Sequence, residues 1–101
     1  MSPRVKDKAI KLLIEYLNTN GKDSFGYFMS KDVLIRRSVV QVVVNDLIDD
    51  IRRSDIGLDS VLDNYIQKMG QMAKEVSNPG LFYEARDVAG DIEEMIHSYE
   101  Y

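Results

Sequence analysis

The longest apolar stretch of the chain spans residues 33–51, VLIRRSVVQVVVNDLIDDI. Five of the six residues at 39–44 are valine, and β-branched side chains favour strands. No other segment, however, offers a convincing partner strand. Apolar residues recur here at spacings of seven, four, three and four, which places them on one side of an α-helix: Val33, Val40, Val44, Leu47 and Ile51. We therefore predict a helix over about 31–53.

Further valines make this helix apolar on most of its circumference. Such a helix is either central in a bundle or pressed against another subunit. Each valine costs about a few tenths of a kcal/mol relative to alanine in a helix, whereas burying its side chain contributes about 1.5 kcal/mol. Packing therefore outweighs propensity, and we take Val39, Val42 and Val43 as candidate protein-interface residues.

Three other segments show the three-four spacing of amphipathic helices. The first begins at residues 2–3 and ends at 18–21, and the other two are separated by an Asn-Pro-Gly break at 78–80. Their inward residues include Ala9, Leu12, Leu13, Leu62, Tyr65, Met69, Ala85, Val88, Ile92 and Ile96. Four helices with short connections predict an all-α fold, an antiparallel four-helix bundle-like domain with the helix at 31–53 central. At 101 residues, the chain is expected to form a single helical domain, 1–101.

The connection at 22–29 is unusually apolar. It contains three aromatic residues around a glycine, Phe25, Tyr27 and Phe28. A loop of this composition either folds over the ends of the helices or forms a docking surface for a partner. The core interpretation is favoured because a small bundle needs a cover for its helix ends, and the three residues remain candidate interface residues.

Composition narrows the possible classes of function. The chain has no cysteine, which excludes disulfides, thiolate zinc sites and cysteine nucleophiles. No apolar run approaches the roughly 18 residues needed to span a membrane, and the first residues, MSPRVK, lead into an amphipathic pattern rather than a signal peptide. We therefore expect a cytoplasmic protein with no membrane partner.

The net charge of −4 conceals a split along the chain. Residues 1–37 carry eight Lys and Arg against four Asp and Glu, and the remainder carries five against thirteen. The basic residues of 1–37 could form a face that binds the phosphates of a nucleic acid. The candidate nucleic-acid contacts are Arg4, Lys8, Lys11, Lys31, Arg36 and Arg37. The long connection argues against a helix-turn-helix unit, and the overall charge is acidic.

Acidic residues follow a helical stripe in the last segment, Glu84, Asp87, Asp91 and Glu94, and Asp46, Asp49 and Asp50 lie in the helix at 31–53. Such stripes can hold Mg²⁺ in helical enzymes, but this one lies beside or outside the apolar face. Glu94 and His97 match one half of a di-iron motif, yet the chain has a single histidine, which we interpret as a surface residue. We assign no metal, cofactor, catalytic or small-molecule site, and the chain contains no nucleophile elbow, Walker loop or dinucleotide fingerprint.

The remaining function class is a small non-enzymatic helical module, an adaptor or regulator that works through protein–protein interaction. A homodimer is one form of this hypothesis. The alternative is an accessory or regulatory factor that binds nucleic acid through its basic N-terminal face. Six tyrosines and five methionines suit either an interface or a core.

Overall fold

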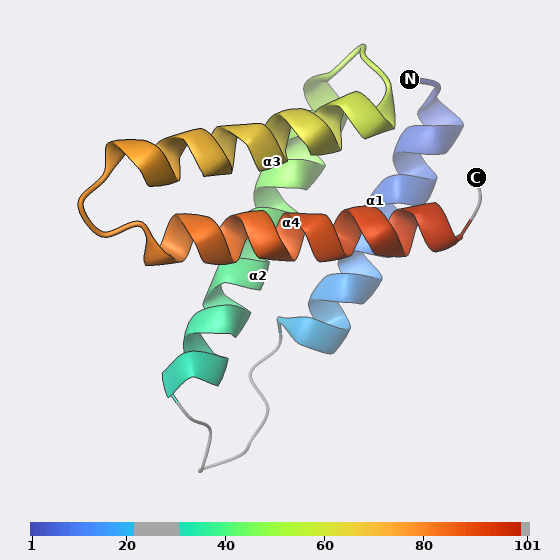
Figure 1. The fold of residues 1–101 in the computed structure, drawn as a ribbon. Helices are drawn as coiled ribbons and strands as arrows, with labels where there is room; N and C mark the ends of the chain where they lie inside the picture. Colours follow the sequence, from blue (N-terminus) through green and yellow to red (C-terminus); the bar gives the residue numbers. More distant parts are fainter. Residues whose placement is uncertain (22–30, 100–101) are drawn as a thin grey trace.

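The computed structural model describes residues 1–21 and 31–99. These residues form four α-helices: α1 (Pro3–Asn20), α2 (Lys31–Arg53), α3 (Leu58–Glu75) and α4 (Gly80–Ser98) (Figure 1). The prediction of an all-α, four-helix domain is confirmed. None of the described helices is long and apolar enough to cross a membrane.

The helices form two antiparallel hairpins that cross each other. In Figure 1, α1 and α2 run side by side in opposite directions, and the α3–α4 hairpin lies across them. α2 contacts each of the other three helices, so the prediction that it is central is also confirmed. It contributes seven buried residues. Four residues of the predicted spacing, Val40, Val44, Leu47 and Ile51, are fully inaccessible, whereas the prediction was wrong for Val33, which lies in the first turn of α2 and is 41% exposed.

Local sequence signals explain where the helices begin and end. The side-chain oxygen of Ser2 accepts a hydrogen bond from the backbone N–H of Val5 at 3.2 Å, and Pro3 occupies the first turn, where its missing N–H costs nothing. Asp32 lies in the first turn of α2, and two arginines lie in its last turn, so both ends complement the helix dipole. The predicted N-cap of α2, Ser30, lies outside the described residues.

Gly21 allows α1 and α2 to approach closely. It is buried, and a Cβ atom added there would lie 3.1 Å from Cγ1 of Val40. The side-chain amide of Gln41 donates a hydrogen bond to the Gly21 carbonyl, which has no partner within the helix. Gly21, at which α1 ends, therefore also allows the close contact between α1 and α2.

Two side-chain contacts link α3 to its neighbours. The hydroxyl of Tyr65 donates a hydrogen bond to Asp46 of α2 at 3.0 Å. Near the other end of α3, Nε2 of His97 lies 2.7 Å from Asp59 Oδ1 and joins the end of α4 to the start of α3. His97 is exposed, as the sequence predicted.

The burial of α2 leads to a stability prediction. Leu47 is fully buried among all four helices, so Leu47→Ala should lower the free energy of unfolding by about 2–5 kcal/mol. Leu34 lies on the same helix but is 45% exposed, and Leu34→Ala should change stability by less than about 1 kcal/mol. Urea denaturation followed by circular dichroism measures both values, and equal losses would contradict the assigned core.

The contact between His97 and Asp59 predicts a pH dependence. The hydrogen bond to Asp59 raises the pKa of His97 above its ordinary value of 6.5, and the negative charges of Asp59 and Glu93 add to this. Because the pKa is higher in the folded state, the stabilisation is complete below about pH 6.5 and is lost as pH rises through the raised pKa. A proton NMR titration should show the raised midpoint in the wild type and a lower one in Asp59→Asn; the same midpoint in both proteins would contradict the contact.

Candidate protein-interaction groove

An open groove of about 640 Å³ lies where the first half of α2 meets the end of α3 and the start of α4. Its walls are mainly apolar, with Leu34, Ile35, Val39 and Val42 from α2, Tyr65, Met69 and Met72 from α3, and Leu81, Phe82 and Ala85 from α4. We refer to these residues as the groove. Three of them are among the most exposed large apolar side chains in the described part of the chain, Leu81 at 60%, Val42 at 58% and Leu34 at 45%.

The groove exists because α2 is apolar on two sides. Val42 follows Val40 by two residues and precedes Val44 by two, and two residues correspond to about 200° around a helix. Val40 and Val44 are fully buried, so Val42 points almost directly away from the core. The groove lies beside this outward side, between α2 and the α3–α4 hairpin, and Val42 is 58% exposed there.

Polar groups at the groove are few. Lys31 and Lys68 line it and are exposed. Asp46 also lines it and accepts the hydrogen bond of Tyr65. Burial raises the pKa of Tyr65, and Asp46 raises it further, so the phenol stays a neutral donor. The groove is therefore mainly apolar, and two positive charges and one negative charge line it.

The six interface residues predicted from the sequence have different positions. Val42 is exposed in the groove, and Val39 is only 8% exposed at its floor. Val43 is fully buried in the core, where no partner can reach it. Phe25, Tyr27 and Phe28 lie outside the described residues. The sequence missed the contribution of α3 and α4, because their groove residues follow the same spacing as core residues.

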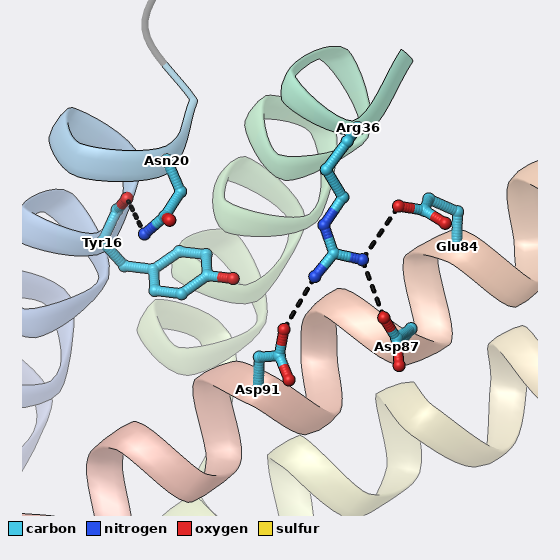
Figure 2. Close-up of polar contacts among 6 residues, drawn as sticks. All are labelled: Tyr16, Asn20, Arg36, Glu84, Asp87 and Asp91. Atoms are coloured by element: carbon cyan, nitrogen blue, oxygen red, sulfur yellow. Dashed lines mark hydrogen bonds and ion pairs between the residues drawn. The ribbon is translucent and has the colours of Figure 1, made fainter. Parts of the chain in front are cut away.

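Arg36 forms the largest cluster of ion pairs in the described residues (Figure 2). Its Nη1 atom lies 2.8 Å from both Glu84 Oε1 and Asp87 Oδ2, and its Nη2 atom lies 2.7 Å from Asp91 Oδ2. Tyr16 of α1 lies beside the cluster, and its pKa is raised by burial and then by the charge of Asp91. The guanidinium thus joins α2 to three successive turns of α4.

This cluster joins residues from two separate predictions. Arg36 is one of the candidate phosphate contacts, and Glu84, Asp87 and Asp91 are three of the four residues of the candidate Mg²⁺ stripe, the fourth being Glu94. The structure pairs Arg36 with Glu84, Asp87 and Asp91. The opposite charges of the two halves of the chain indicate that basic and acidic residues pair. Which residues pair with each other depends on how α4 packs on α2. Within residues 1–21 and 31–99, no group of three acidic or histidine side chains is placed to hold a metal ion.

The candidate nucleic-acid contacts do not form one patch. Nζ of Lys6 donates a hydrogen bond to the Arg52 carbonyl at 3.3 Å, so the start of α1 lies beside the end of α2. Arg4 is in that first turn, whereas Lys31 is at the opposite end of α2, about 30 Å away at 1.5 Å per residue. Arg4, Lys8 and Lys11 are exposed on α1, Lys31 borders the groove, Arg37 is half-buried, and Arg36 binds the carboxylates.

No family model, curated protein or solved structure matches this chain. The geometry of the protein's own surface is therefore the basis for a proposed function. The apolar groove and the Arg36 cluster each bring together residues that are distant in sequence. Of these, the groove is the one open to a ligand.

The Arg36 cluster leads to a prediction about stability. Arg36→Leu leaves three carboxylates close together without their counterion, and it should lower the free energy of unfolding by about 1–2 kcal/mol at low salt. The difference from the wild type should shrink in 0.5 M NaCl, because salt screens the repulsion among the carboxylates, at about 4 Å Debye length. The control is Arg53→Leu, whose side chain is 75% exposed and pairs only with Asp50 among the ion pairs observed. A loss no larger than that of the control would show that the cluster contributes no stability.

Proposed function

We propose that this protein is a non-enzymatic protein–protein interaction module that binds an amphipathic helix in the groove. The observation that carries the proposal is the exposure of Leu34, Val42 and Leu81 along one continuous apolar groove. Burying a large apolar side chain contributes about 1.5–3 kcal/mol, so covering these residues favours association. The ligand that covers these residues must itself be apolar on the side that faces the groove.

A helix fits this groove better than an extended peptide does. The groove is bounded by side chains of three helices, and the exposed backbone edge that an added strand would need is absent from the described residues. Leu34 and Val42 are eight residues apart, about 12 Å along α2 at 1.5 Å per residue, which corresponds to about two turns of a ligand helix. Met69 and Met72 provide flexible side chains that adapt to different apolar partners.

The two lysines that line the groove outnumber its one carboxylate, Asp46, and this balance favours an acidic ligand. Lys31 and Lys68 would attract carboxylates that flank the apolar side of the ligand helix, which raises the rate of association and fixes its direction. A second open groove, of about 650 Å³, runs along α1, but five charged residues line it: Lys6, Asp7, Lys11, Glu15 and Arg52. It is less suited to an apolar ligand.

Nucleic-acid binding has weaker support than helix binding. The nucleic-acid hypothesis requires one continuous basic face, whereas the basic residues lie at both ends of the α1–α2 hairpin. Arg36, the central member of the set on α2, is already bound by three carboxylates. The groove, in contrast, combines exposed apolar area with matching charge.

The test of the proposed function is the binding of a synthetic helix. The probe is a fluorescent peptide of about 18 residues, long enough to form a helix, with leucines at i, i+3, i+4 and i+7 and glutamates at its ends. Fluorescence anisotropy should give a Kd of about 1–100 μM for the wild type. Val42→Asp and Leu81→Asp place a charge in the groove and should each weaken binding at least about tenfold.

Two controls make this result specific. Ile56→Asp alters a residue that is 46% exposed and lies away from the groove, so its Kd should equal that of the wild type. A peptide of the same composition without helical periodicity should bind at least about tenfold more weakly. Equal effects of Val42→Asp and Ile56→Asp, or the absence of binding, would contradict the proposal.

A further inference from the structure

We propose that the helix bound in the groove is α2 of a second copy of this chain, in an antiparallel arrangement. The inference rests on the proposed function and names its partner. In this dimer, the outward side of each α2 lies in the groove of the other copy. The twofold axis passes next to the midpoint between Ser38 and Val42.

The outward side of α2 has a pattern that is symmetric about this midpoint. Six positions repeat at spacings of four, three, four, three and four, as they do along a coiled-coil seam: Lys31, Ile35, Ser38, Val42, Asn45 and Asp49. In an antiparallel pair centred between Ser38 and Val42, each position faces its mirror position in the other copy. The short side chain of Ser38 then lies opposite Val42, which lets the two helices approach closely.

Charge complementarity supports this register. Lys31 at one end of the stripe lies opposite Asp49 of the other copy, and the twofold axis creates this pair twice. Lys31 and Asp49 are both exposed. Each also lies at the end of α2 where its charge opposes the helix dipole, a cation near the N-terminus and an anion near the C-terminus. An antiparallel neighbour places the opposite charge and the opposite dipole end next to each of them.

The apolar contacts explain how one dimer covers the grooves of both copies. Val42 of one copy would enter the other copy's groove, where Met69 and Met72 form the wall. Because the interface is isologous, the same side chains are covered in both copies at once. Asn45 lies opposite Ile35 in this register, and a polar residue at a seam position fixes register at some cost in stability. The predicted pairing is therefore specific in register and moderate in affinity.

Two single charge reversals test this arrangement. In Lys31→Asp, both interface pairs become acid against acid, and in Asp49→Lys both become lysine against lysine. Each variant alone should dimerise at least about tenfold more weakly than the wild type. When the two variants are mixed, every pair is again complementary, so a heterodimer should form with about the wild-type affinity. Analytical ultracentrifugation measures the four dissociation constants, with one variant labelled by a fluorophore in the mixture.

Controls separate this interface from other effects. Lys11→Asp changes the net charge by the same amount as Lys31→Asp but lies on α1, and it should leave the dimer constant unchanged. Val42→Asp should give a monomer with the wild-type circular dichroism spectrum, because Val42 is exposed and its loss opens no cavity. A dimer that survives Val42→Asp would place the contact elsewhere and overturn the inference.

The remaining outcomes distinguish the two proposals. A wild-type protein that stays monomeric up to about 1 mM would overturn the homodimer. If that monomer binds the synthetic helix and Val42→Asp abolishes the binding, the groove is still an interaction site, and its partner is another protein. If the monomer fails to bind the helix, both proposals fall. A wild-type dimer with no recovery in the mixed variants would overturn the antiparallel register.

Discussion

The packing of α1, α3 and α4 on one side of α2 is the interaction on which the rest of the structure depends. Valine is a poor helix former, and several valines in succession would weaken an isolated helix by about a few tenths of a kcal/mol each. Their burial contributes about 1.5 kcal/mol each or more, so the helix is stable only when the other helices cover it. α2 contacts all three of them, and Val40, Val44 and Leu47 are fully inaccessible. Secondary and tertiary structure therefore form together here.

The packing of three helices on one side of α2 leaves its other side uncovered. Two crossed hairpins can enclose the core side of α2, but the α3–α4 hairpin crosses it at an angle and does not follow its whole length (Figure 1). Val42 and Leu34 consequently remain exposed, at 58% and 45%. The uncovered apolar side of α2 is the physical basis of the proposed interaction.

The sequence predicted what depends on periodicity and failed to predict what depends on orientation. The three-four spacing identified four helices, and Val40, Val44, Leu47 and Ile51 lie in the core as expected. Periodicity could not distinguish Val43, which is buried, from Val42, which is exposed, because α2 is apolar nearly all round. Nor could it show that Arg4 and Lys31 lie at opposite ends of a hairpin, or that Arg36 faces α4. Those facts depend on how helices pack, which is a property of the whole chain.

The Arg36 cluster connects the charges of the protein to its apolar groove. Arg36 is adjacent in sequence to Ile35, which lines the groove, and it holds Glu84, one turn from Leu81 on α4. The ion pairs therefore link α2 to the part of α4 next to the groove, while the fully buried residues form a core cluster that does not include Arg36. The acidic stripe that suggested metal chemistry thus has a structural role, and it shapes the surface on which the proposed interaction depends.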